Sequence, residues 1–89
     1  MDELDERLDG NAAGGVLESI FPFEMTTART ICAGCGERSQ IAELAVYAHG
    51  MGTIIRCPQC DTALMRVVQA EGYFWLDLRG TVSLQLAES

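Results

Sequence analysis

The sequence predicts a small, mostly-β domain in which about five short strands form an antiparallel sheet and one short α-helix lies near the N-terminus. Three observations lead to this fold class. The chain has 89 residues, so its hydrophobic core alone is marginal, and folds of this size usually carry a staple. Its four cysteines form two Cys-x-x-Cys pairs. Several segments alternate between apolar and polar residues, as half-buried strands do. We therefore expect a metal-bound domain.

An amphipathic helix is expected over residues 10–22. Pro22 ends it, because a proline disfavours helical backbone at the residue before it. Gly14 and Gly15 each cost roughly 1 kcal/mol relative to alanine, so this helix needs a surface on which to dock. Its apolar stripe consists of Ala13, Val16, Leu17, Ile20 and Phe21. The stripe covers one face of the strand region, or it docks another protein or a second copy through Val16, Leu17, Ile20 and Phe21; both interpretations stay open.

The rest of the chain divides by charge and pattern. Residues 1–9 hold five acidic residues and one arginine, an acidic tail charged enough to be disordered. Residues 23–29 form a linker, and residues 30–89 form the metal-bound domain. Five strands are expected in that domain, over residues 40–48, 53–56, 62–69, 72–78 and 81–86. The single histidine, His49, falls in the turn after the first strand, and we interpret it as a turn residue rather than a ligand.

The composition narrows the partners and the compartment. The formal charge is −7, which is the wrong sign for binding nucleic acid by neutralising phosphates, so a protein partner is favoured. The acidic N-terminus lacks the basic and apolar regions of a secretory signal, and no run approaches the roughly 18 apolar residues of a membrane span. We therefore expect the protein to lie in a reducing cytoplasm and not in a membrane. In a reducing compartment paired cysteines bind metal more often than they form structural disulfides.

The cysteines carry the clearest chemistry. Cys32 and Cys35 form the first pair, Cys57 and Cys60 the second, and 21 residues separate the pairs, a spacing typical of zinc sites. Four thiolates complete a tetrahedral zinc shell and leave no open position for water or substrate, which indicates a structural ion. Two reversible disulfides are the alternative to a metal.

The residue after each pair supports two tight turns. Gly36 follows the first pair and Asp61 the second. Glycine suits a backbone with positive φ, and aspartate tolerates that region better than most other residues. Both turns are therefore expected to aim their sulfurs at one ion.

These two elements resemble the knuckles of the zinc-ribbon superfamily, which implies knuckles on the ends of adjacent hairpins beside a three-stranded sheet. They are also similar to the knuckles of rubredoxins, which would imply iron in place of zinc. The chain departs from rubredoxins in lacking an aromatic-rich core around the knuckles and in having Asp61 where the second knuckle glycine would stand.

Residues 8 to about 86 also resemble a family of small uncharacterised proteins from high-GC bacteria. The resemblance rests on a Leu-Asp-Gly-Asn helix start at residues 8–11, a Glu-Met-Thr segment within residues 24–28, the two knuckles, and an Asp-Leu-Arg-Gly turn at residues 77–80. No function is assigned to that family, so the resemblance implies none.

Tyr73 and Trp75 share one face of the strand expected over residues 72–78. Exposed, they would anchor a protein partner or stack on bases. In so small a domain we expect one face of that strand to pack on the sheet and the other on the N-terminal helix.

The sequence therefore favours a non-catalytic, zinc-stabilised binding or adaptor module with a protein partner. It shows no nucleophile–base pairing, phosphate-binding glycine loop or paired carboxylates that would indicate an enzyme. One alternative is a nucleic-acid contact of the transcription type through Arg56, Arg66, Arg79 and Trp75. The other is a rubredoxin-like iron or thiol redox protein using the same four cysteines.

Overall fold

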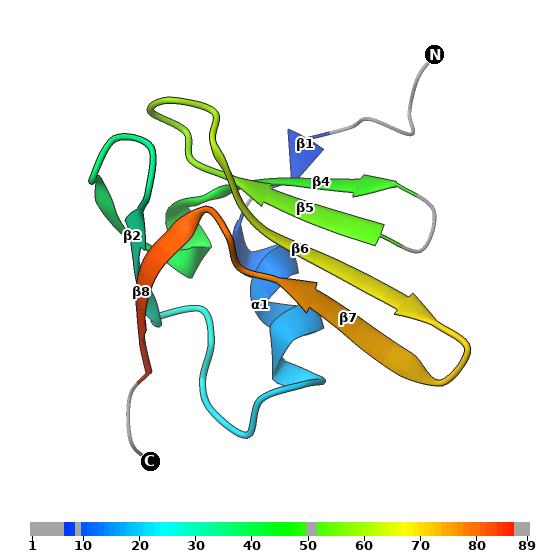
Figure 1. The fold of residues 1–89 in the computed structure, drawn as a ribbon. Coiled ribbons are helices and arrows are strands. Elements are labelled where there is room, and N and C mark those ends of the chain that lie inside the picture. Colours follow the sequence, from blue (N-terminus) through cyan, green and yellow to red (C-terminus); the bar gives the residue numbers. More distant parts are fainter. Residues whose placement is uncertain (1–6, 9, 50–51, 87–89) are drawn as a thin grey trace.

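The computed structural model describes residues 7–8, 10–49 and 52–86, which form two antiparallel sheets and one short α-helix (Figure 1). The first sheet has five strands in the order β1-β4-β5-β6-β7 and the second has three in the order β3-β2-β8. The elements are β1 (Arg7–Leu8), α1 (Gly10–Glu18), β2 (Arg29–Cys32), β3 (Arg38–Gln40), a 3₁₀ turn η2 (Ile41–Glu43), β4 (Ala45–His49), β5 (Gly52–Arg56), β6 (Ala63–Ala70), β7 (Tyr73–Asp77) and β8 (Thr81–Gln85). The mostly-β class is confirmed.

The prediction of one sheet with about five strands was wrong. The five expected strands correspond to β4 to β8, while β1, β2 and β3 were missed. These three strands have two to four residues each, too few for alternation to stand out. β2 and β3 pair with each other on either side of the first cysteine pair, and β2 also pairs with β8. The chain thereby builds a second sheet.

The expected strand over residues 40–48 was also too long. Its first part is η2, and regular strand begins only at Ala45. The Glu43 carboxylate reaches back to accept a hydrogen bond from the backbone N–H of Gln40 at 2.9 Å, which holds the tight turn in the manner of a capping box. Glutamine is not a usual first residue of a capping box, so this turn carries no clear signal in the sequence. The apolar residues Ala42 and Leu44 alternate with polar ones and therefore favoured the prediction of a strand.

Helix α1 ends at Glu18, before the expected limit at residue 22. Beyond it the backbone N–H groups of Ile20 and Phe21 both donate to the carbonyl of Leu17 at 2.9 Å. This shared carbonyl closes the C-terminal end of the helix. Within the segment expected as an acidic tail, Arg7 and Leu8 pair with Tyr47 and Val46 as β1. Residues 1–6 and 9 lie outside the described part of the chain.

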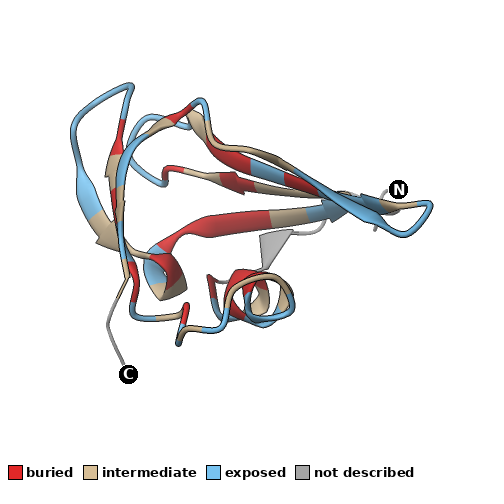
Figure 2. Cartoon of the chain, turned by 60° about the horizontal axis from the view of Figure 1, so that its bottom comes forward, coloured by how far each residue is buried: buried red, intermediate tan, exposed pale blue. Residues whose placement is uncertain are grey.

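The apolar stripe of α1 packs inside the molecule. Leu17 is 1% exposed and Ala13 is fully buried, while Val16, Ile20 and Phe21 pack against the core from its rim. Figure 2 shows the helix on one side of the five-stranded sheet. One of the two glycines expected to weaken the helix has a packing role, because a Cβ at Gly14 would collide with the side chain of Thr26. The glycine lets the segment after the helix approach it closely.

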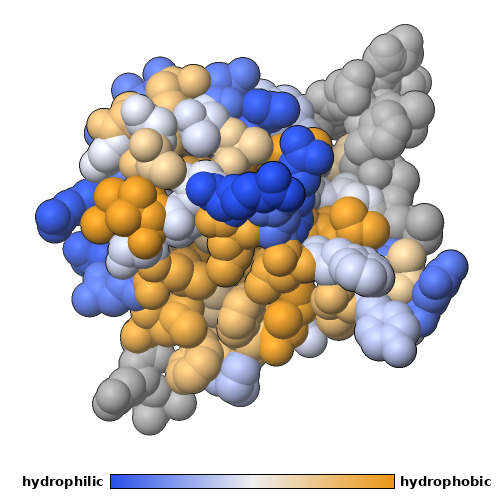
Figure 3. All heavy atoms as spheres, viewed as in Figure 1, coloured by the Kyte–Doolittle hydropathy of each residue, from blue (hydrophilic) through white to orange (hydrophobic). Residues whose placement is uncertain are grey.

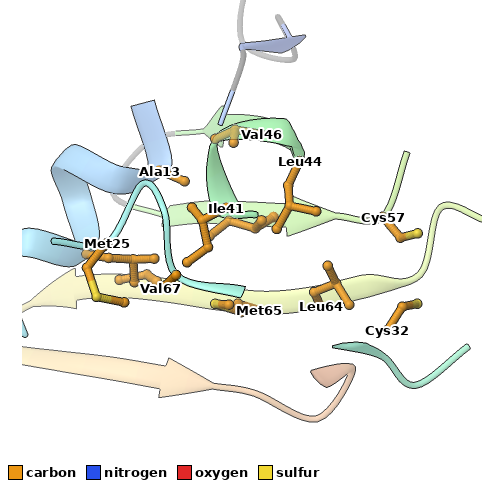
Figure 4. Close-up of a cluster of buried hydrophobic side chains, with 13 residues drawn as sticks. Ala13, Met25, Cys32, Ile41, Leu44, Val46, Cys57, Leu64, Met65 and Val67 are labelled. Carbon is orange, nitrogen blue, oxygen red and sulfur yellow. The ribbon is translucent and has the colours of Figure 1, made fainter. Parts of the chain in front are cut away.

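The core runs from the helix to the cysteines. Figure 4 shows Ala13 and Met25 at one end of the buried cluster and Cys32 and Cys57 at the other, with Leu64 between. Its remaining buried members are aliphatic side chains and one methionine: Leu17, Ala28, Ile41, Leu44, Val46, Ile55, Met65 and Val67. Among the described residues no aromatic side chain is fully buried. The two cysteines therefore form the end of the core rather than a separate site.

The five-stranded sheet has one covered face and one open face. Successive residues of a strand point to opposite sides, and the strand register puts Val46, Ile55 and Val67 on the side that packs against α1. We call the opposite side the outer face. It carries Tyr47, Ile54, Arg66, Val68, Tyr73, Trp75 and Asp77.

Tyr73 and Trp75 correct a sequence expectation. Both were expected to pack within the domain, but Tyr73 is 68% exposed and Trp75 is 64% exposed on the outer face. The single helix covers the opposite side, so nothing in the described chain lies over them. Their ring centroids are 6.4 Å apart with the planes inclined at 54°, a contact between neighbours on one strand face.

None of the described helices combines the length and apolar character that crossing a membrane requires.

Candidate metal centre

Each cysteine pair sits in a tight turn that joins two antiparallel strands. We call residues 32–36, between β2 and β3, knuckle 1, and residues 57–61, between β5 and β6, knuckle 2. The backbone closes both turns in the same way. The N–H of Cys32 donates to the carbonyl of Glu37 at 3.0 Å, and the N–H of Cys57 donates to the carbonyl of Thr62 at 2.9 Å. The two hairpins thus present equivalent loops from different sheets.

The backbone after each pair has the conformation expected from the sequence. Gly36 has φ of 79° and Asp61 has φ of 68°, both in the left-handed region. The N–H of Gly36 then donates to the carbonyl of Cys32 at 2.9 Å, and that of Asp61 to the carbonyl of Cys57 at 2.8 Å. The chain turns back on the first cysteine of each pair, which leaves both sulfurs on the same side of the loop.

The structure brings all four sulfurs together. The four Sγ atoms lie within 4.8 Å of one another, with 3.6 Å between Cys32 and Cys60 and 3.7 Å between Cys35 and Cys57. All four cysteines are free thiols, since a disulfide would bring two sulfurs to about 2.05 Å. In a regular tetrahedron with metal–sulfur bonds of about 2.3 Å, sulfurs lie about 3.8 Å apart. The donor set fits a four-coordinate metal ion.

Hydrogen bonds hold the sulfurs in position. The N–H of Gly34 donates to Cys32 Sγ at 3.2 Å and the N–H of Gln59 to Cys57 Sγ at 3.4 Å. The Thr62 hydroxyl lies 3.0 Å from Cys60 Sγ. Donors of this kind orient metal ligands and stabilise negative charge on sulfur. A Cβ at Gly34 would collide with the Thr62 hydroxyl, so the two knuckles meet at this point.

The electrostatics of the bare thiols differ within knuckle 1. Burial acts to raise the pKa of Cys32, but hydrogen bonds from the backbone of Cys35 and Gly34 and from the neighbouring thiols outweigh it, and the pKa falls to about 6. For Cys35, a backbone hydrogen bond from Glu37 acts to lower the pKa, but desolvation and the other three sulfurs prevail and raise it to about 12. The negative charge of the first thiolate opposes ionisation of the neighbouring thiols. A bound cation would remove this repulsion by neutralising the thiolates.

The cluster lies at the surface end of the core. Cys32 and Cys57, the first cysteine of each knuckle, are buried, while Cys35 and Cys60 are exposed. Around it, Arg56 closes knuckle 2 by donating from its guanidinium to the carbonyl of Asp61 at 2.9 Å. Within the described residues the four cysteines are the group that can hold a metal ion.

Comparison with known proteins places the chain in a family. A model described as a family of unknown function, DUF6510, matches residues 3–89. The chain belongs to this family. No curated protein and no solved structure matches it. The sequence-based resemblance to an uncharacterised family is thus confirmed, whereas the match to DUF6510 identifies no zinc-ribbon family. Membership in DUF6510 carries no function with it, so the function has to be argued from the site.

The structure separates the residues that the nucleic-acid hypothesis grouped. Arg66, Trp75 and Arg79 line one shallow hollow of about 530 Å³ together with Val68, Leu76, Asp77 and Leu78. Arg56 lies elsewhere, at knuckle 2. Within the hollow Asp77 pairs with Arg79 at 3.0 Å. Hydrogen bonds from the Arg79 backbone and side chain, with smaller Coulombic contributions from Arg79 and Arg66, lower the pKa of Asp77.

The other residue singled out from the sequence, His49, is the last residue of β4 and pairs with Gly52. The rest of the expected turn, residues 50–51, lies outside the described chain.

Sequence reasoning missed a second surface, on the three-stranded sheet. A hollow of about 660 Å³ lies there, and its lining includes Arg29, Arg38, Gln40, Ser83 and Gln85. The register aligns Arg29 with Gln40 and Ile31 with Arg38, so both arginines lie on one face. Because β2 and β3 were not recognised as strands, no periodicity in the sequence pointed to this pairing.

Proposed function

We propose that this DUF6510 protein is a non-catalytic, zinc-stabilised binding module that engages a protein partner through the outer face of its five-stranded sheet. The observation that carries the proposal is the exposure of Tyr73 and Trp75 beside Val68 on a sheet face that no other element covers. Large exposed aromatic side chains on a monomer mark interaction sites more often than chance placement does. The rest of the argument concerns the metal, the partner and the surface.

Zinc is the metal that the donor set favours. Four thiolates in a tetrahedron suit zinc or iron, and the sulfur separations of 3.6 Å and 3.7 Å suit either. The absence of a buried aromatic side chain from the described core sets this chain apart from rubredoxins. The two knuckle-bearing hairpins, one in the three-stranded sheet and one in the five-stranded sheet, support a fold of the zinc-ribbon kind. With four protein ligands no position remains for substrate, so the ion is structural and the module has no catalytic site there.

The residues around Tyr73 and Trp75 indicate the character of the partner. Tryptophan, tyrosine and arginine are the residue types that dominate binding energy at protein interfaces, and Arg66 and Arg79 line the same hollow as Trp75. The Arg79 side chain is 91% exposed even though it pairs with Asp77. A partner with an apolar centre and an acidic rim would complement this surface. The N-terminal stripe of Val16, Leu17, Ile20 and Phe21 is already used by the chain's own core.

Site-specific crosslinking tests the proposal. A photoreactive residue placed at Tyr73 should capture a protein other than this one in the cells that make it. The same residue at Val82, which is 66% exposed on β8, is the matched control and should not. The purified partner should then bind the parent chain and lose at least about tenfold in affinity with Trp75→Ala but not with Val82→Ala. Equal capture from both positions, or equal affinity of the two variants, would overturn the proposed surface.

One observation favours a second candidate, a sequence-tolerant nucleic-acid contact. Arg66, Arg79 and Trp75 do line one hollow, and a tryptophan beside arginines can stack on a base while the cations contact phosphate. The net charge of −7 opposes it. Binding of a single-stranded oligonucleotide that weakens steeply with added salt would support this candidate. The absence of binding at low salt would exclude it.

A further inference from the structure

Strand β7 is the edge of the five-stranded sheet. It pairs with β6 on one side, and within the described chain no strand pairs with its other side. Every second residue of β7 therefore turns its backbone N–H and C=O groups towards open space, which is a template for another strand. Figure 1 shows β7 running along the border of the sheet.

Apart from Asp77 at its end, this edge lacks the features that normally protect an exposed strand. Natural edges carry charged side chains such as lysine, a proline or a bulge, or they are very short. β7 reads Tyr-Phe-Trp-Leu-Asp, and its pairing with β6 continues without a register shift from Tyr73 to Asp77. The pairs β5–β6 and β2–β8, by contrast, both contain a shift. A regular, mostly apolar edge of five residues predicts that a second strand covers it.

Both faces of the sheet are apolar at this edge. Val68 and Trp75 lie on the outer face and Leu76 lies on the opposite face of β7, and all three line the hollow described above. Phe74 is also exposed at this border. Figure 3 shows hydrophobic residues gathered over the region between β7 and β8 in the view of Figure 1. An added strand would therefore find apolar contacts for side chains on both of its faces.

We propose that the occupant is a second copy of this chain, whose β7 pairs antiparallel with β7 about a two-fold axis at Trp75. In that register Trp75 lies opposite the partner's Trp75, Phe74 opposite the partner's Leu76, and Tyr73 opposite the partner's Asp77. Aromatic–aromatic and aromatic–aliphatic pairs stabilise antiparallel strands. The tyrosine hydroxyl can donate to the carboxylate, and no like charges face each other. The strand is complementary to itself, as a two-fold interface requires.

The size of the contact predicts a weak, reversible dimer. Aromatic side chains bury about 150–250 Å² each, so the exposed fractions of Tyr73, Phe74 and Trp75 set an upper limit on the order of 400 Å² of aromatic surface per copy, part of which stays on the outer face. A stable complex usually buries about 800 Å² per partner. The dimer joins two five-stranded sheets into one and brings both aromatic pairs onto a continuous outer face. It does not depend on the protein partner proposed above.

Sedimentation of the metal-loaded full chain tests the dimer, over roughly 1 µM to 1 mM. We expect the mass to rise from monomer to dimer, and backbone amides of β7 to exchange more slowly at the high concentration. Trp75→Glu and Trp75→Lys should each weaken dimerisation at least about tenfold, since each places like charges opposite one another. An equimolar mixture of the two should dimerise again, because Glu then faces Lys. Val82→Lys, with nearly the same exposure as Trp75, should behave as the parent does.

Each outcome decides the proposal. A monomer at every concentration would overturn it. So would a dimer that Trp75→Lys and Val82→Lys affect equally, because the interface would then lie elsewhere. A mixture of the Glu and Lys variants that stays monomeric would refute the register about Trp75. Since Trp75 is mostly solvent-exposed, the variants should keep the parent's far-ultraviolet circular dichroism. Failure to dimerise would leave the crosslinking result from Tyr73 unaffected, so the two proposals fail separately.

Discussion

Gly36 and Asp61 hold the same place in the two knuckles, and both have a left-handed backbone, with φ of 79° and 68°. An L-residue pays about 1–2 kcal/mol in this region, and β-branched residues fare worst. We therefore expect Gly36→Val to lower the free energy of unfolding of the metal-loaded protein by about that amount or more. No atom outside the chain neighbours lies within 4 Å of a Cβ at Gly36, so the loss would come from backbone strain alone.

Asp61→Gly is the matched comparison. It relaxes the backbone and removes an ion pair with Arg56 at 3.8 Å, in which the Asp61 side chain is 78% exposed. Such pairs contribute little, so the change should stay within about 0.5 kcal/mol. Denaturant titration followed by circular dichroism measures both variants. An equal loss for the two would show that the carboxylate of Asp61, rather than φ, controls the turn.

The candidate site was largely predictable from the sequence because its signals are local. A Cys-x-x-Cys turn requires only a few residues to position two sulfurs, and Gly36 and Asp61 report the backbone conformation directly. The meeting of the two knuckles is a long-range feature, yet four cysteines near one cation have few alternatives. The contact of Thr62 with Cys60 could not be predicted from the sequence, since a threonine next to a strand does not by itself indicate a hydrogen bond to a cysteine.

The second sheet and the open face were not predictable by the same means. β2 and β3 are too short for periodicity, and they exist because the knuckle holds them side by side. The exposure of Tyr73 and Trp75 depends on where α1 docks. Alternation along β7 shows that Phe74 and Leu76 lie on one face of the strand and Trp75 on the other, but it does not show which face the helix covers. A single helix shields one side of the sheet, so the larger aromatic residues stay in solvent.

Removing the metal should unfold much of the strand region. Metal binding free energy is folding free energy in small domains of this kind, and here Cys32 and Cys57 form one end of the core. Protein purified without added metal should contain one zinc per chain and no visible colour. Excess chelator should then abolish most of the β-sheet circular dichroism, and zinc should restore it. Metal-free protein that stays folded would contradict a structural ion, and a coloured iron form would favour electron transfer.

Zinc affinity should weaken as the pH falls. Only thiolates bind the ion, so binding displaces the protons that the thiols of the metal-free chain hold. In the folded cluster the pKa of Cys32 is lowered from 9.0 to about 6, so this thiolate stabilises the fold fully above about pH 9, and that contribution is lost as the pH falls from about 9 to about 6. Competition with a coloured chelator measures the pH dependence; an affinity that stays constant from about pH 8 to about pH 5 would contradict binding through thiolates.

Leu17 should be among the most sensitive positions outside the cysteines. It is 1% exposed between α1 and the sheet, and truncating a buried leucine costs about 2–5 kcal/mol. Leu17→Ala should lower the free energy of unfolding by that amount without changing the mass of the protein in solution. Val82→Ala, at an exposed site, should change it by no more than about 0.5 kcal/mol. If Leu17→Ala changed the mass and left stability intact, the helix would be an intermolecular surface instead.

Thr62→Val should weaken metal binding while leaving the fold in place. The hydroxyl of Thr62 lies 3.0 Å from Cys60 Sγ, and valine keeps the volume of threonine but cannot donate a hydrogen bond to the sulfur. Loss of such an outer contact to a metal ligand typically costs about 10–100-fold in affinity. Cys60 is also exposed, so its thiolate should become more reactive towards an alkylating agent in the variant. Competition with a chelator and the rate of alkylation give the two readouts. Thr27→Val, at an exposed position in the segment between α1 and β2, is the control for the substitution itself. An unchanged affinity in Thr62→Val would mean that knuckle geometry alone determines the strength of the site.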